Sequence, residues 1–355
     1  MFLCQAPEHS REKFLAFSVT YIIISKSGIL EEEKMKKNRK LLVAALLAFL
    51  LVFGIVRPVY GWNSHGMTLS YVLQNESWLS KYNDITITEY SYKDVDTAPV
   101  NPNFQIKYLD GEIGEKTTAA KILTTYADEP DWDMDTELNL SKLQILTGGS
   151  QGWRHQYYGL GFIRLGAGPE RAQYWFDLAM KTHEKEDDYW TFRFLARSLH
   201  QIEDLTCPYH TVPAPTGIIF KNIVKLSNLI TMGKNHHYNI EEYQGQQIAL
   251  SNSDWINCLT QAKPLDVEVK SAEWLGKYAA TLGRKDVKTL WGLEDKFFGS
   301  SISGNKEWYY DKSTVGIAPQ DSVQAQYDAA IFKALSRFSS FSQTFLDYAK
   351  ENLGL

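Results

Sequence analysis

Residues 199–210 read Leu-His-Gln-Ile-Glu-Asp-Leu-Thr-Cys-Pro-Tyr-His, which is the spacing H-x3-D-x5-H. If residues 189–204 are helical, His200 and Asp204 lie four positions apart on one face of that helix. Pro208 ends the helix, and His210 returns toward it from the turn beyond. Two imidazoles and a carboxylate are ligands that suit Zn²⁺. The stretch therefore predicts a metal site, with an ordinary surface pair on a helix as the alternative.

The helix that carries this motif is predicted from its apolar spacing. Asp187 or Asp188 can cap its start. Apolar residues recur at i, i+3, i+7 and i+10, namely Phe192, Leu195, Leu199 and Ile202. Further helices are expected at residues 65–79, 115–126, 169–185, 221–231, 236–249, 270–282, 284–295 and 321–352.

The remaining segments are rich in turn-forming residues. Residues 83–115 and 211–220 are expected to be loops, with a short extended piece at 85–90, and residues 147–153 are Gly-rich. The chain is 44% hydrophobic, which is enough to bury a sizeable core. We therefore predict an all-α protein in which residues 62–355 form a single compact multi-helix domain.

Residues 35–61 have the layout of a secretory signal peptide. Four Lys and Arg residues stand between positions 36 and 40, a run of 16 apolar residues covers 41–56, and Val-Tyr-Gly occupies 59–61. A membrane anchor is the alternative, but a span needs about 20 apolar residues. We expect cleavage before Trp62 and a secreted or periplasmic protein. Residues 1–34 are expected to be a gene-model extension or a non-native leader, because Met35 opens the signal sequence.

The charge of the expected mature chain argues against a nucleic-acid-binding surface. Without residues 1–61, which hold nine of the 37 basic and five of the 42 acidic residues, the net charge is −9. Proteins that bind nucleic acid through its phosphates are expected to present a basic stripe instead.

Two cysteines, Cys207 and Cys258, lie in residues 62–355. An exported protein permits a disulfide between them, and two separate buried thiols are the other alternative. Cys207 stands between two expected metal ligands. We do not expect it to be a ligand, because nitrogen and oxygen donors are already plentiful.

Four further contexts offer metal ligands. Trp62 and His65 stand at the expected mature N-terminus, Asp128 lies in an acidic turn, and His155 lies among aromatic residues. His237 and Glu241 form an H-x3-E pair, which also shares one helix face. The neighbouring His236 is the alternative to His237, but the spacing to Glu241 favours His237.

Together these residues resemble the zinc-dependent phospholipase C family, which is related in fold to the single-strand-specific fungal and plant nucleases of the S1/P1 type. The family order is Trp, His, Asp, His, H-x3-D-x5-H and H-x3-E. It is matched here, in order, by Trp62, His65, Asp128, His155, His200, Asp204, His210, His237 and Glu241.

The resemblance implies the all-α fold of that family and a site for three zinc ions. One zinc would be held by the α-amino nitrogen and carbonyl oxygen of Trp62, by His65 and by a bridging Asp204. A second would be held by Asp128, His155, His200 and Asp204. The third would be held by His210, His237 and Glu241.

Several details of this sequence depart from the bacterial phospholipases. Only three positions separate Trp62 from His65, as in the nucleases, and residues 211–236 are longer. Glu129 follows Asp128 where the phospholipases often have an aromatic residue against choline, which leaves the headgroup open. Glu241 favours the phospholipase branch, since the nucleases usually have Asp there.

The expected function is that of a secreted, monomeric zinc phosphodiesterase, most simply a phospholipase C. Two zinc ions that share a water lower its pKa, and Asp128 would orient or deprotonate that water. The substrate would be a phospholipid or another phosphodiester, with transient contact to a membrane surface. The alternatives are a single-strand nuclease with the same zinc ligands and a non-catalytic binding protein in which zinc serves folding.

Overall fold

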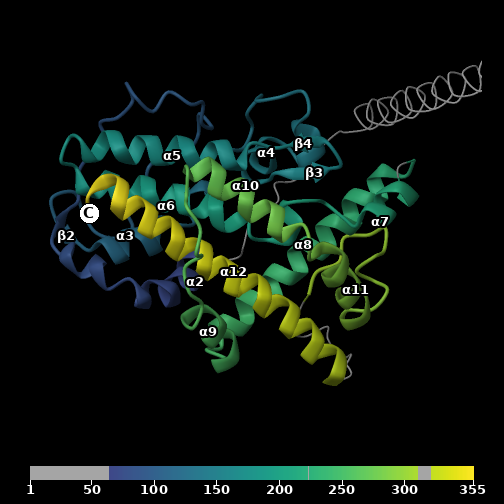
Figure 1. Cartoon of the computed structure of the whole chain (residues 1–355). Helices are drawn as coiled ribbons and strands as arrows, with labels where there is room; N and C mark the ends of the chain where they lie inside the picture. The colour runs from purple at the N-terminus through teal and green to yellow at the C-terminus, as the bar shows by residue number, and fades with distance from the viewer. Residues whose placement is uncertain (1–63, 223, 311–320) are drawn as a thin grey trace, which may run out of the picture. The chain divides into compact units, whose positions relative to one another are not determined.

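The computed structural model describes residues 64–222, 224–310 and 321–355 (Figure 1). Of the structure, 59% is helix and 4% is strand, so the all-α prediction is confirmed. The signal peptide, the expected extension at 1–34 and Trp62 lie outside the described residues. Among the residues that the structure describes, no helix is both long and apolar enough to span a lipid bilayer.

The described helices keep the order of the chain. The α-helices are α2 His65–Val72, α3 Ala119–Tyr126, α4 Ser150–His155, α5 Gly168–His183, α6 Asp188–Asp204, α7 Thr216–Asn222, α8 Leu226–Ala249, α9 Ser253–Thr260, α10 Ala272–Gly283, α11 Val287–Phe297 and α12 Asp321–Leu353. Short 3₁₀ helices are η1 Leu73–Asn75, η2 Ser77–Lys81, η3 Glu129–Asp131, η4 Gln144–Thr147 and η5 Pro208–His210.

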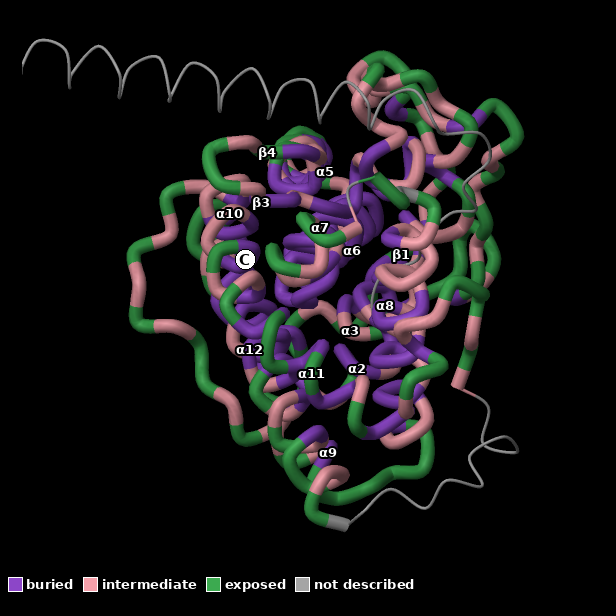
Figure 2. The backbone as a smooth tube through the Cα atoms, turned by 90° about the vertical axis from the view of Figure 1, so that its right-hand side faces the viewer, coloured by how far each residue is buried: buried purple, intermediate pink, exposed green. Residues whose placement is uncertain are grey.

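The interior is built around α6. The Asp187 side chain caps its start by accepting a hydrogen bond from the Trp190 backbone N–H, as the sequence predicts. Every residue from Tyr189 to Asp204 is buried, and Figure 2 draws buried backbone in purple. A helix buried all round belongs in the centre of a domain. Helices α5, α3, α10 and α12 pack against it.

The long helix α12 closes this core from the C-terminal side. Figure 1 shows it in yellow, running past α10, α2 and α9, which it contacts. Its buried aromatic residues include Phe338, Phe341 and Phe345. The Phe345 ring lies 6.0 Å from that of Phe176 on α5, so the end of the chain is packed onto the α5–α6 layer.

Two short antiparallel ladders complete the fold. Strand β1 (Ile85–Thr86) pairs with β2 (Lys116–Thr117) in the register Ile85 to Thr117. Strands β3 (Tyr158–Leu160) and β4 (Ile163–Leu165) form a hairpin. Gly161 sits in its two-residue turn with φ +61°, which is the conformation that such turns require.

Several boundaries differ from the sequence-based prediction. Helix α2 ends at Val72 and gives way to η1 and η2, because Glu76 leaves the helical conformation and its carboxylate accepts the Trp78 Nε1–H bond at 2.8 Å. Helix α8 is continuous from 226 to 249 instead of two segments. Helices α4, α7 and α9 were expected as loop. Each is short, and tertiary contacts rather than a long apolar period support such helices.

The two cysteines are free thiols, Cys207 buried and Cys258 partly exposed. Of the two alternatives left by the sequence, separate thiols is therefore the one observed.

A buried ion cluster joins η3 to α6. Arg193 Nη2 lies 2.5 Å from Glu129 Oε1, and Arg197 Nε lies 2.7 Å from Glu129 Oε2. Burial would raise the pKa of Glu129, but the two guanidinium groups hold it down at about 2. The acidic turn that contains Asp128 and Asp131 is thereby anchored to the central helix.

Replacing Glu129 with Gln should lower the free energy of unfolding by about 3–5 kcal/mol, because two buried guanidinium groups lose their counter-charge. Urea unfolding measures the difference. The control is Glu273→Gln, since Glu273 pairs with Lys277 at a half-exposed site on α10 and a surface pair contributes at most about 1 kcal/mol. Equal losses in the two variants would contradict the role given to Glu129.

Candidate metal centre

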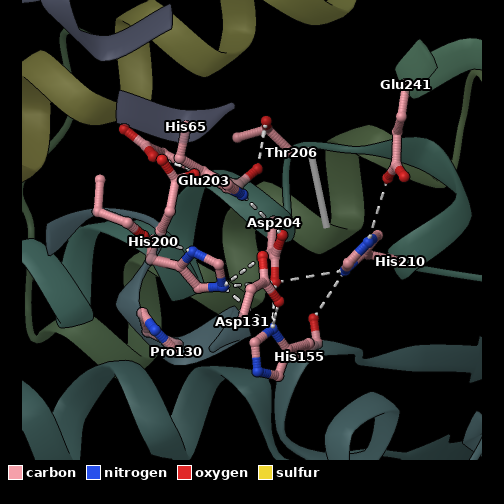
Figure 3. Close-up of polar contacts among 12 residues, drawn as sticks. His65, Pro130, Asp131, His155, His200, Glu203, Asp204, Thr206, His210 and Glu241 are labelled. Carbon is pink, nitrogen blue, oxygen red and sulfur yellow. Dashed lines mark hydrogen bonds and ion pairs between the residues drawn. The ribbon is translucent and has the colours of Figure 1, made fainter. Parts of the chain in front are cut away.

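The candidate ligands come from six separate segments of the chain. Helix α6 carries His200 and Asp204 at its C-terminal end, and η5 ends with His210. Helix α8 carries His237 and Glu241. The other donors are His65 at the start of α2, His155 at the end of α4 and Asp131 at the end of η3. Figure 3 shows most of these side chains converging on one region.

Asp204 is the centre of this arrangement (Figure 3). Its carboxylate oxygens lie 2.9 Å from His155 Nδ1, 3.3 Å from His200 Nε2, 3.3 Å from His65 Nε2 and 3.6 Å from His210 Nδ1. All five side chains are fully buried. One carboxylate that faces imidazoles from four segments is placed to bridge more than one cation.

The donor atoms of the described residues fall into three groups, each within 4.8 Å. The groups are His65, His200 and Asp204; Asp131, His155 and His200; and Cys207, His210, His237 and Glu241. The first two share His200, so they adjoin one another. These buried His, Asp, Glu and Cys side chains could hold metal ions.

Three of the imidazoles are oriented by acceptors on their outer side. His65 Nδ1 donates to Glu203 Oε2 at 2.8 Å, His200 Nδ1 to the Ala127 carbonyl at 2.7 Å and His210 Nδ1 to the His155 carbonyl at 2.9 Å. A proton on Nδ1 leaves the Nε2 lone pair of a neutral imidazole free to bind a metal. Outer acceptors of this kind accompany the histidine ligands of metal sites.

Several inward atoms have no hydrogen-bond partner among the described residues. They are His65 Nε2, His210 Nε2, His237 Nε2, Asp204 Oδ1 and Glu241 Oε1. His237 Nε2 and Glu241 Oε1 are 2.7 Å apart, but they are not aligned as a hydrogen bond. A buried polar atom without a partner costs about 1–3 kcal/mol. Cations among these atoms would satisfy them together, so the residues present fit metal binding.

The electrostatics of the site suit cations. Burial lowers the pKa of His237 well below its ordinary value, and the neighbouring His210 lowers it further, so the ring is neutral. Burial would raise the pKa of Asp204, but His210 and His200 hold it well below its usual range. Burial and the Asp204 and Asp131 carboxylates raise the pKa of Glu241 well above its usual value. A bound cation would favour its ionised form.

The acidic turn places Asp131, rather than Asp128, among the grouped donors. Asp131 Oδ1 lies 3.4 Å from His155 Nδ1. Asp128 belongs to none of the three groups found in the described part of the chain, and its Oδ2 accepts the Gly66 backbone N–H at 3.2 Å. The role of Asp128 as ligand and water-orienting group stays a prediction. Spacing alone cannot choose between two carboxylates at opposite ends of one 3₁₀ turn.

Gly66 is what allows His65 to reach the site. A Cβ at position 66 would stand 2.1 Å from the Thr124 carbonyl oxygen at the end of α3. Only glycine therefore lets α2 begin this close to α3. The contact also brings the Gly66 N–H to Asp128, so the start of α2 and the acidic turn are held together.

His236 and Glu129 face away from the centre. His236 Nδ1 lies 2.7 Å from Glu294 Oε2, and its ring stacks on Trp291 at 3.5 Å, so His237 is the histidine beside Glu241. Glu129 is bound to Arg193 and Arg197, as described above. Asp131 and Glu203 are the site residues that sequence reasoning missed. Glu203 had one available signal, because it adjoins Asp204 and follows His200 by three positions.

A cavity of about 760 Å³ borders the metal centre. Phe104, Lys107, Trp132 and Gln151 are among its lining residues. Gln151 connects the two features, since its Nε2 donates to Asp131 Oδ1 at 3.0 Å. A ligand held in this cavity would therefore reach the edge of the donor groups.

Asp204→Asn should remove the charge that faces all four histidines. We expect affinity for Zn²⁺ to fall by about tenfold or more and the chain to retain fewer ions. Elemental analysis after gel filtration in Zn²⁺ measures the stoichiometry. Asp254→Asn, at the exposed start of α9, is the control of equal charge change. Full occupancy in Asp204→Asn would rule out a bridging role.

Neither a scan against protein-family models nor a search of curated proteins finds a match to this chain. The chemistry of the metal centre is therefore inferred from its own residues.

Proposed function

We propose that this protein is a zinc-dependent phosphodiesterase with three zinc ions, and that it acts as a phospholipase C. The observation that carries the proposal is the convergence of Asp204 and four histidines on inward atoms without partners. Nitrogen and oxygen donors at this density suit zinc. Bound zinc supplies a lowered water pKa and neutralises charge on a phosphate group.

The protein's own residues would orient and protect this chemistry. Glu203 and the carbonyls of Ala127 and His155 hold three imidazoles in the tautomer that binds metal. Asp128 and Asp131 are the half-buried carboxylates at the edge of the centre, where a proton from the attacking water can be accepted. Complete burial of Asp204 excludes bulk water from the bridging carboxylate.

A lipid substrate is supported by an apolar surface on α7. None of the residues of α7 is buried, and Phe220 is 60% exposed. Val224, directly after the helix, is 87% exposed. Lys221 and Lys225 stand beside them and are exposed. Exposed apolar side chains flanked by lysines are typical of segments that insert into the headgroup region of an anionic membrane. The helix begins six residues after the candidate ligand His210.

A single-strand nuclease is the second candidate, because of the cavity beside Asp131. Trp132 and Phe104 line it together with amide side chains such as Gln151. Aromatic rings stack on nucleobases, and such stacking is worth about 1–3 kcal/mol per base. The same cavity can hold a lipid headgroup, so the substrate has to be decided by assay.

The function is tested by hydrolysis with and without a chelator. We expect the Zn²⁺-loaded protein to release diacylglycerol from mixed phospholipid vesicles, and a chelator to abolish that release. A parallel arm contains single-stranded DNA and RNA, and Asp204→Asn serves as the inactive control. Nucleotide release alone would move the protein to the nuclease branch. No turnover in either arm, with zinc bound, would favour a non-catalytic role in which zinc serves folding.

The membrane role of α7 is tested by a double substitution, Phe220→Ser with Val224→Ser. Loss of two apolar anchors should lower the rate on vesicles by about tenfold or more. The rate on a short-chain phospholipid below its critical micelle concentration should stay the same, because no surface has to be bound. Leu250→Ser is the matched control, since Leu250 is 64% exposed at the end of α8. Equal losses on both substrates would count against membrane docking.

A further inference from the structure

Cys207 lies between the end of α6 and η5, at the N-cap position of η5. Its side chain is fully buried and forms no disulfide. Its sulfur belongs to the same group of donor atoms as His210, His237 and Glu241. The surroundings of this thiol therefore decide whether it is a packing residue or a ligand.

The three neighbouring side chains present unsatisfied atoms to this group. His210 Nε2, His237 Nε2 and Glu241 Oε1 are buried and have no hydrogen-bond partner among the described residues. Glu241 Oε1 lies 3.7 Å from His210 Nε2 and 2.7 Å from His237 Nε2. The two rings are nearly perpendicular, at 86°, so their donor atoms approach from different directions. Three oxygen and nitrogen donors alone would leave one position of a tetrahedral ion open.

The sulfur lies within reach of the same ion. All four donor atoms lie within 4.8 Å of one another. Ligands about 2.0–2.3 Å from a tetrahedral zinc stand about 3.3–3.6 Å apart, so a small contraction of the group reaches that geometry. One sulfur, two nitrogens and one oxygen make a complete tetrahedral set for a metal that accepts soft and borderline ligands.

The backbone around Cys207 is arranged for a thiolate. The N–H groups of Tyr209 and His210 both donate to its sulfur. A neutral thiol is a weak hydrogen-bond acceptor, whereas an anionic sulfur gains from two such donors. Without a cation the nearby Glu241 carboxylate opposes a second negative charge here. A divalent cation between the two groups converts that repulsion into shared coordination.

We propose that Cys207 is the fourth protein ligand of a metal ion held by His210, His237 and Glu241. With four protein ligands the site is closed, which is characteristic of structural metal sites rather than catalytic ones. The ion would join the α6–η5 junction to α8 and stabilise the fold. Hydrolysis would then belong to the two groups that share His200; this division of labour rests on the proposed function, whereas the ligand set does not.

The test replaces zinc with Co²⁺ and records the near-ultraviolet spectrum. A thiolate bound to Co²⁺ gives a charge-transfer band that nitrogen and oxygen ligands do not give. We expect the band in the wild-type protein, saturating at one equivalent of Co²⁺ per chain, together with a rise in melting temperature. The double variant Cys4→Ser with Cys258→Ser is the matched control, because it leaves Cys207 as the only thiol and should keep the band.

Cys207→Ser should lose the band and bind one fewer ion tightly. Absence of the band in Co²⁺-loaded wild-type protein, or its persistence in Cys207→Ser, would overturn the proposal. The wild-type spectrum decides the ligand even if Cys207→Ser does not fold.

The structural role is tested by loading order, with hydrolysis followed in the same titration. Because a thiolate strengthens binding of this ion, the first equivalent should produce the band and the rise in melting temperature, with turnover appearing only as further equivalents bind. Turnover that begins together with the band would show that this ion is catalytic. The band without hydrolysis of any phosphodiester would refute the proposed function alone, and hydrolysis without the band would refute the cysteine ligand alone.

Discussion

The structure depends on one carboxylate that is removed from water and surrounded by imidazoles. Asp204 faces His65, His155, His200 and His210, which come from α2, α4, α6 and η5. An ionised carboxylate is costly to bury unless it is paired or coordinates a metal. The surrounding acceptors, Glu203 and two backbone carbonyls, follow from that constraint, because they fix which nitrogen of each ring faces the carboxylate.

Charged residues inside the domain build the frame that holds this site. Helix α6 is buried along its length although it carries Arg193, Arg197 and Glu203. The two arginines are neutralised by Glu129, which fixes the acidic turn, and Glu203 also accepts the Ser342 hydroxyl of α12 at 2.8 Å. Packing alone would tolerate small shifts of these elements. Directional ion pairs hold the ligand-bearing segments in one arrangement.

The donor groups divide into two regions with different chemistry. Around Asp204 the donors are nitrogen and oxygen, and the neighbouring cavity gives access through Gln151 and Asp131. Around Cys207 a sulfur completes the set, and all four donors are buried. An open, hard-donor region suits turnover, and a closed region with a soft donor suits stability. The exposed apolar residues of α7 lie along the chain between these ligands and α8, which would couple membrane contact to this part of the fold.

The sequence by itself determined the helical class, the central helix 188–204 with its Asp187 cap, and the pairing of His200 with Asp204 and of His237 with Glu241. Each of these depends on contacts within one turn or on a period of 3.6 residues, so spacing alone predicts them. The N-terminal region with Trp62 lies outside the described residues, and its role stays a prediction.

Only the tertiary structure decided which side chains meet across the chain. It grouped Asp131 rather than Asp128 with His155, turned His236 toward Glu294, and gave Glu129 to the arginines of α6. It also set Cys207 beside Glu241 and left Cys258 apart as a free thiol. Neighbouring residues such as Asp128 and Asp131, or His236 and His237, have the same chemistry in sequence. They differ only in direction, which is set by the elements packed around them.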